Sequence, residues 1–89
     1  MNVKGHILCV DDDDRLRDLL KRYLTREGHD VTTAKDAESA RRLMATMAFD
    51  LVILDVMMPG EDGLSLLKSV REKKSDTPVI LLTARSLPA

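Results

Sequence analysis

The stretch I-L-C-V-D-D-D-D at residues 7–14 joins a short apolar run directly to four consecutive aspartates. A run of four apolar residues bounded by polar ones is typical of a strand that is buried on both faces of a parallel sheet. Four adjacent carboxylates repel one another, so a chain needs a reason to place them where such a strand ends. The stretch therefore predicts a buried first strand that leads into a functional loop.

The next part of the chain has the pattern of two helices. After residue 14 the apolar residues recur with the i, i+3, i+4, i+7 spacing of an amphipathic helix, and Gly28 is suited to end it. The members of this stripe are Leu16, Leu19, Leu20, Tyr23 and Leu24. Asp36 is suited to cap a second helix that reaches about residue 47.

A third helix is expected after the turn-rich loop at residues 58–63, with Leu64, Leu67 and Val70 facing inward. Three further strands are expected at residues 31–34, 51–54 and 79–82. The element order is then βαβαβαβ. This alternation predicts the α/β class: a doubly wound parallel sheet covered by helices on both faces and joined by right-handed crossovers.

Composition limits the function classes that the chain can belong to. The 89 residues suffice for one small domain, and a net charge of −1 provides no general attraction to nucleic acid or to a membrane surface. Aromatic residues make up 2% of the chain, which leaves no platform for stacking bases. No apolar run approaches the roughly 18 residues of a membrane span or forms a signal peptide, so a cytoplasmic location is expected. The single Cys9 is interpreted as a buried structural thiol.

Polar residues follow three of the four expected strands. They are Asp11 and Asp12 after the first, Asp55 after the third, and Thr83, which Ala84 follows, after the fourth. In open α/β sheets, ligands bind beyond the carboxyl ends of the strands, where the winding direction reverses. If the first and third strands are neighbours, the three carboxylates converge. A hard divalent ion such as Mg²⁺ would then offset their repulsion and would let a carboxylate attack a phosphoryl group.

Three separated motifs occur in the order that characterises one known family. V-D-D at 10–12, L-D-V-M-M-P-G-E-D-G at 54–63 and L-T-A at 82–84 resemble the receiver domain of two-component response regulators. The stretches at 11–24 and 57–64 most resemble the OmpR-type branch. The resemblance implies a flavodoxin-like fold, here with four strands and three helices. It also implies transfer of a phosphoryl group from a sensor histidine kinase to an aspartate.

The family's site residues carry over to matching positions. The resemblance makes Asp55 the phosphoacceptor and a ligand of Mg²⁺. Asp12 binds the ion, Asp11 helps through water, and the backbone carbonyl of Met57 completes the protein ligands. The domain is then a phosphoacceptor, capable at most of phosphorylating and dephosphorylating itself, rather than an enzyme with a separate substrate.

The resemblance assigns the phosphoryl oxygens to the Thr83 hydroxyl and the Ala84 N–H. The family also has a fifth strand, followed by a turn with a site lysine, and no residue here can be assigned to that lysine. Residues 1–89 are therefore expected to be a receiver domain incomplete at its C-terminus, with weak phosphorylation and no DNA-binding part. Strand 79–82 would then be an exposed apolar edge, which predicts a homo-oligomer through edge pairing or exchange of elements.

Two alternatives remain open. A pseudo-receiver would keep the fold as a protein-interaction module without carrying phosphate, which the absence of the lysine favours. A Mg²⁺-dependent phosphohydrolase would use Asp11, the first acid of a D-x-D motif, as its nucleophile, but it leaves Asp55 without a role. Asp13 and Asp14 are interpreted as acids that start a helix.

Overall fold

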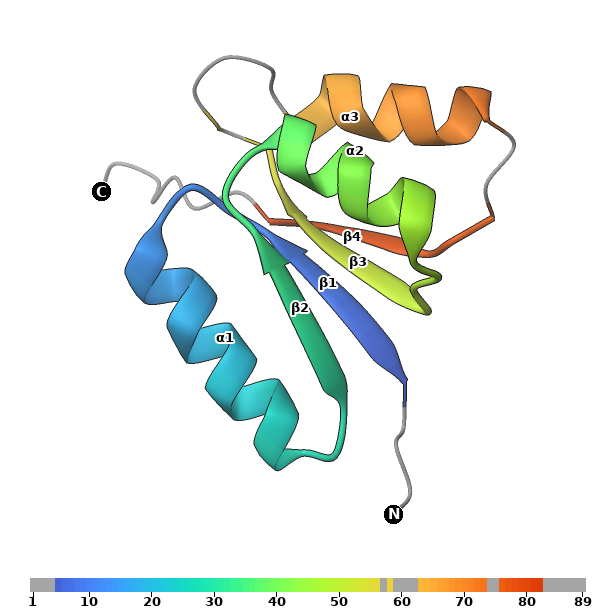
Figure 1. Cartoon of the computed structure of the whole chain (residues 1–89). Helices are drawn as coiled ribbons and strands as arrows, with labels where there is room; N and C mark the ends of the chain where they lie inside the picture. Colours follow the sequence, from blue (N-terminus) through green and yellow to red (C-terminus); the bar gives the residue numbers. More distant parts are fainter. Residues whose placement is uncertain (1–4, 57, 59–62, 74–75, 83–89) are drawn as a thin grey trace.

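The computed structural model describes residues 5–56, 58, 63–73 and 76–82 (Figure 1). Its elements are β1 (His6–Val10), α1 (Asp14–Arg26), β2 (Asp30–Ala34), α2 (Ala37–Thr46), β3 (Leu51–Asp55), α3 (Gly63–Glu72) and β4 (Val79–Leu82). Their order is the predicted βαβαβαβ. None of the helices in this part of the chain has both the length and the apolar character that a membrane crossing requires.

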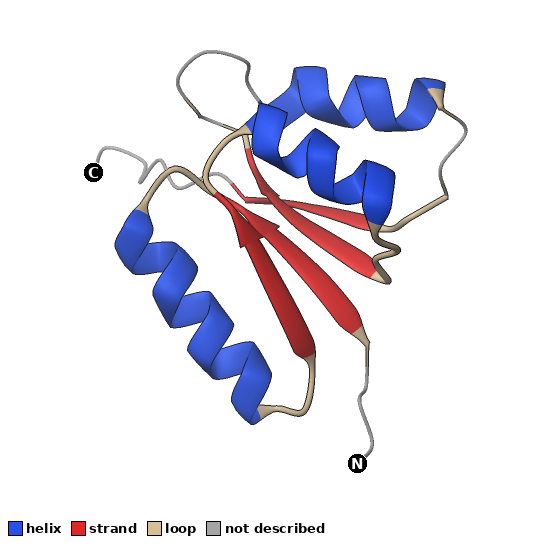
Figure 2. Ribbon diagram, viewed as in Figure 1, coloured by secondary structure: helices blue, strands red, loops and turns tan. Residues whose placement is uncertain are grey.

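The four strands form one parallel sheet in the order β2-β1-β3-β4. Helix α1 covers one face of the sheet, and α2 and α3 lie together on the other (Figures 1 and 2). The winding direction therefore reverses between β1 and β3, the point at which doubly wound folds bind their ligands. The predicted flavodoxin-like fold and the adjacency of the first and third strands are both confirmed.

Strand β1 supplies both halves of the hydrophobic core. Successive side chains of a strand point to opposite faces, so Leu8 and Val10 pack toward α2 and α3, whereas Ile7 and Cys9 pack toward α1. All four are at most 3% exposed, which confirms that this strand is buried on both faces. Burial, together with the nearby Asp11 carboxylate, raises the pKa of the Cys9 thiol to about 11. The thiol therefore stays protonated at neutral pH.

Helix ends follow the expected chemistry. Asp13 is the N-cap of α1, and its side chain accepts hydrogen bonds from the backbone N–H groups of Arg15 and Leu16 at 2.9 and 3.2 Å. This confirms that Asp13 is a helix-start acid, and Asp14 lies in the first turn. Gly28 has a φ of 99°, the left-handed conformation that suits a residue just beyond a helix end.

The inward face of α3 differs from the prediction at Leu64, whereas Leu67 and Val70 pack against the core as predicted. Leu64 is 52% exposed, whereas Leu66 is only 1% exposed and Val70 is buried four residues further on. The helix begins at Gly63, which lies against the backbone of β3 and directs the buried stripe through residues 63, 66 and 70. Leu64 is rotated about 100° from Gly63 around the axis of the helix and therefore faces outward.

The apolar stripe of α1 is wider than the surface that it covers. Leu20 and Leu24 pack against the core, but Leu19 and Tyr23 are 60% and 57% exposed. The helix packs mainly against β2 and β1, at one edge of the sheet, so part of its stripe stays exposed. The apolar periodicity thus predicted the helix correctly but overestimated the width of its buried face.

Candidate metal and phosphoacceptor site

The pairing of β1 with β3 brings the predicted acids together. Val10 lies opposite Leu54 in this parallel pair, so the next residues, Asp11 and Asp55, emerge side by side at the carboxyl edge of the sheet. Asp11, Asp12 and Asp55 each offer a carboxylate oxygen, and these oxygens lie within 4.8 Å of one another. The predicted convergence of the three carboxylates is therefore confirmed.

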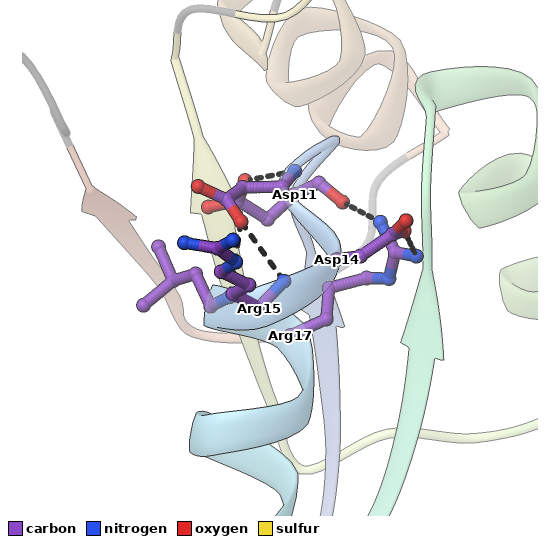
Figure 3. Close-up of polar contacts among 6 residues, drawn as sticks. Asp11, Asp14, Arg15 and Arg17 are labelled. Carbon is purple, nitrogen blue, oxygen red and sulfur yellow. Dashed lines mark hydrogen bonds and ion pairs between the residues drawn. The ribbon is translucent and has the colours of Figure 1, made fainter.

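Asp11 is held by hydrogen bonds on three sides. Its backbone N–H donates to the Ala34 carbonyl at 3.0 Å, and its own carbonyl accepts from Nη1 of Arg17 at 2.7 Å (Figure 3). Its carboxylate Oδ1 accepts from the backbone N–H of Asp13 at 2.8 Å. The second oxygen, Oδ2, is buried and has no hydrogen-bond partner in the described part of the chain. A buried carboxylate oxygen is costly to leave unpaired, so this atom is compatible with a cation ligand.

Electrostatics point to the same conclusion. Two full negative charges at 4.8 Å repel each other by about 3 kcal/mol at an effective dielectric constant of about 20. The pKa of Asp11 is raised, first because burial penalises its charged form and then because Asp55, Asp12 and Asp13 add negative charge nearby. The hydrogen bond from the Asp13 N–H opposes this shift. A cluster made only of carboxylate oxygens is compatible with a hard ion such as Mg²⁺.

Asp55 is the last residue of β3 and is 2% exposed. The residue after it, Val56, donates its N–H to the Leu82 carbonyl of β4 at 3.0 Å, and its carbonyl accepts from the N–H of Gly63 at 3.1 Å. A Cβ atom on Gly63 would lie 2.2 Å from the backbone oxygen of Asp55. Only glycine allows α3 to begin this close to the end of β3, and this contact fixes the position of Asp55.

Three predicted site residues, Met57, Thr83 and Ala84, lie outside the described residues. Their roles as metal ligand, switch hydroxyl and phosphate contact stay predictions. His6 lies at the start of β1, whereas the acids follow the end of that strand, and its Nε2 is 2.7 Å from the Thr32 hydroxyl.

Arg17 belongs to the surroundings of the site, although the sequence motifs assign it no role there. Its guanidinium hydrogen-bonds to the Asp11 carbonyl and forms an ion pair with Asp14 (Figure 3). The sequence could have indicated this role only by spacing: Arg17 lies six residues after Asp11 and one helical turn after Asp14. Such spacing is common on exposed helices, so it could not reveal a contact with the strand end.

We predict that the Asp11 carboxylate makes the ion-free protein less stable as the pH rises. Because the pKa of Asp11 is higher in the folded protein than in the unfolded chain, the folded state binds more protons between those two values. The contribution of Asp11 to the free energy of unfolding therefore falls as the pH rises from about 3.9, the ordinary pKa of an aspartate, through the raised pKa of the folded protein. Asp11→Asn should be the more stable protein at neutral pH in a chelator.

Urea unfolding of both proteins at several pH values in a chelator provides the measurement. The difference in stability between the two proteins isolates the effect of Asp11. Asp36, whose pKa is lowered by hydrogen bonds from Ser39, adds stability as the pH rises, but it does so in both proteins and therefore cancels. The stability advantage of Asp11→Asn should grow with pH, and Mg²⁺ should reduce it by stabilising the wild type more than the variant. An advantage that is constant or shrinks as the pH rises would refute the prediction.

The fold and the site together define a class of protein: a doubly wound α/β domain with an acidic cluster at the switch point between its two central strands. Comparison with known proteins identifies the family. The sequence matches the response regulator receiver domain over residues 7–88, and the chain belongs to this family. It is thus a receiver domain of two-component signal transduction.

Curated relatives agree with this assignment. The chain is 56% identical over 80 residues to Protein PetR of Rhodobacter capsulatus, covering 90% of this chain and 33% of PetR. It is 44% identical over 79 residues to the transcriptional regulatory protein ResD of Bacillus subtilis, covering 89% of this chain and 32% of ResD. Both are OmpR-type regulators, as the motifs predicted. The chain spans about a third of the length of each of these relatives.

Solved structures give the same fold. The response regulator TrrA of Thermotoga maritima, in complex with Mg²⁺-BeF, superposes with a TM-score of 0.85 at 46% identity, covering 91% of this chain and 70% of TrrA. TrrA in complex with the histidine kinase ThkA superposes with a TM-score of 0.84 at 45% identity, covering 92% of this chain and 71% of that one.

Proposed function

We propose that this receiver domain accepts a phosphoryl group on Asp55 from a sensor histidine kinase in a reaction that requires Mg²⁺. The observation that carries the proposal is the convergence of Asp11, Asp12 and Asp55 within 4.8 Å around the unpaired, buried Oδ2 of Asp11. The complexes of the relative TrrA with Mg²⁺-BeF and with ThkA support both the ion and the partner.

In the proposed reaction, a carboxylate oxygen of Asp55 attacks the phosphorus of a phosphohistidine. The new P–O bond forms as the P–N bond breaks, and the released electron pair returns to the histidine nitrogen. Asp55 then carries an acyl phosphate. Mg²⁺, when bound, would screen the approach of the two anions, and Asp11, Asp12 and the carbonyl of Met57 would hold it with Asp55.

The phosphoryl group adds a charge of about −1.5 to −2 to a cluster that is already acidic. We propose that Mg²⁺, the Thr83 hydroxyl and the Ala84 N–H balance this charge. The domain acts as a phosphoacceptor in the cytoplasm and makes no nucleic-acid contact of its own.

Acetyl phosphate, a small phosphodonor, tests the proposal without the kinase. Intact-mass spectrometry should show partial addition of one phosphoryl group in MgCl₂ and none in a chelator. Hydroxylamine, which cleaves acyl phosphates but not phosphate esters, should remove the label. Failure to label at any Mg²⁺ concentration would refute the proposal and favour a pseudo-receiver. Steady release of phosphate from many phosphomonoesters would instead favour the phosphohydrolase.

We also propose that β4 associates with a second copy of the chain, by edge pairing or by exchange of elements. Among the described strands, β4 pairs only with β3, and its side chains Ile80 and Leu81 are 50% and 40% exposed. An apolar strand edge of this kind favours pairing with another chain. That residues 1–89 are an incomplete receiver domain stays a prediction.

Sedimentation velocity at micromolar concentration should then show a dimer or a larger assembly. Ile80→Lys should shift the protein toward monomer, because a charge on the edge strand opposes pairing. Leu19→Lys is the matched control, since Leu19 is also largely exposed but lies on α1. A clean wild-type monomer would overturn the proposal, as would an equal shift in both variants.

A further inference from the structure

We infer that Arg17 is a positioning residue for the Mg²⁺ site: its guanidinium holds the loop from Asp11 to Asp13 in the conformation that binds the ion. The inference rests on the proposed function, since it concerns the same acidic cluster. It assigns a role to a side chain that lies on the first turns of α1 and outside the acidic motif.

The contacts of Arg17 link the end of β1 to the start of α1. Nη1 donates to the Asp11 carbonyl at 2.7 Å, and Nη2 forms the ion pair with Oδ1 of Asp14 (Figure 3). The Arg17 side chain is 17% exposed, whereas that of Asp14 is 88% exposed. The guanidinium is thus largely withdrawn from solvent, and its planar fork lets one side chain bond both partners at once.

The loop that Arg17 spans is short and fixed at both ends. At its start, the Asp11 carboxylate accepts from the Asp13 N–H. At its end, the Asp13 carboxylate accepts from the first N–H groups of α1. Asp12 lies between these two anchors, so the hydrogen bond to the Asp11 carbonyl helps decide where the Asp12 carboxylate points. Groups that orient metal ligands in this way typically account for about 10- to 100-fold of the metal affinity.

Arg17 has a second effect of opposite sign. Its positive charge lies near the cluster and opposes the approach of a cation, so removal of the charge alone would strengthen Mg²⁺ binding. The contact of Nη1 is with a neutral carbonyl rather than with a ligating carboxylate, so the charge is not placed on the ligands themselves. We therefore expect loss of orientation to outweigh relief of repulsion. The sign of the change in affinity distinguishes the two effects.

The test compares two variants. Arg17→Met removes the hydrogen-bond donors and the positive charge, whereas Arg17→Lys keeps the charge but loses the planar guanidinium that bonds two partners at once. Arg22→Met is the matched control, because Arg22 forms an exposed ion pair with Asp18 on the same helix. Calorimetric titration with MgCl₂ should show about 10-fold weaker binding for Arg17→Met, a smaller loss for Arg17→Lys and less than about a 2-fold change for the control.

Amide hydrogen exchange in a chelator gives a readout that needs no ion. The Asp13 N–H should exchange faster in both Arg17 variants than in the wild type, and at the wild-type rate in Arg22→Met. Unchanged or tighter Mg²⁺ binding by Arg17→Met overturns the inference, as does unchanged exchange of the Asp13 N–H.

If Arg17→Met does not fold, the same two measurements on Arg17→Lys decide. Failure of the wild type to bind Mg²⁺ refutes the proposed function, and exchange at Asp13 still tests the loop.

Discussion

Replacing Asp55 with asparagine lowers phosphoryl incorporation from acetyl phosphate by about 10⁴-fold or more, to below detection, which is the scale of loss when a single catalytic residue is removed. The amide has almost the same shape as the carboxylate, so the variant removes the nucleophilic oxygen and leaves the packing at the end of β3 intact. Mg²⁺ affinity also falls, because one of the three converging carboxylates is lost.

Asp76→Asn is the matched control, since Asp76 is an exposed acid that precedes β4 and lies outside the acidic cluster. It should label like the wild type in the same mass-spectrometric assay. Label that persists in Asp55→Asn would contradict the proposed chemistry. In that case, peptide mapping shows whether the phosphoryl group has moved to Asp11, as the phosphohydrolase alternative requires.

Replacing Gly63 with alanine lowers the free energy of unfolding by about 3 kcal/mol, the upper part of the range for overpacking. The added Cβ would lie 2.2 Å from the Asp55 carbonyl oxygen and 2.9 Å from Cα of Val56. Both obstacles are backbone atoms, so neither can turn aside as a flexible side chain could. Either α3 or the end of β3 must move.

Gly5→Ala is the control for this prediction. A Cβ on Gly5 would meet the flexible side chain of Asp50 at 3.2 Å, so the cost should stay below about 1 kcal/mol. Urea unfolding of the three proteins gives the comparison. Equal stabilities for Gly63→Ala and Gly5→Ala would show that the approach of α3 to β3 is not as close as the structure has it. Mg²⁺ affinity should fall only in Gly63→Ala, since the displaced backbone carries Asp55.

Local chemistry made the helix and strand boundaries predictable. Asp13 and Asp36 cap α1 and α2 as expected, because a capping carboxylate needs only the N–H groups that follow it within three residues. The first strand was predicted for a similar reason, since a strand made of an unbroken apolar run must be buried on both of its faces. Such features are encoded within a few residues and do not depend on the rest of the chain.

The buried faces of the helices were predicted less well. Leu64, Leu19 and Tyr23 all fit an apolar period, yet each is more than half exposed. A helical period gives the spacing of a stripe but not its angular centre or width, which depend on the surface beneath. In α3 that centre is set by Gly63, whose close approach to β3 is a contact between distant parts of the backbone.

By itself the sequence determined the order of the elements, the acids that end the first and third strands, and the family to which the motifs belong. Only the tertiary structure placed β3 beside β1, buried Oδ2 of Asp11 without a partner, and brought Arg17 to the Asp11 carbonyl. Side-chain periodicity records whether a residue faces protein or water. Which residue it meets there is decided by strand pairing and helix packing between segments far apart in the chain.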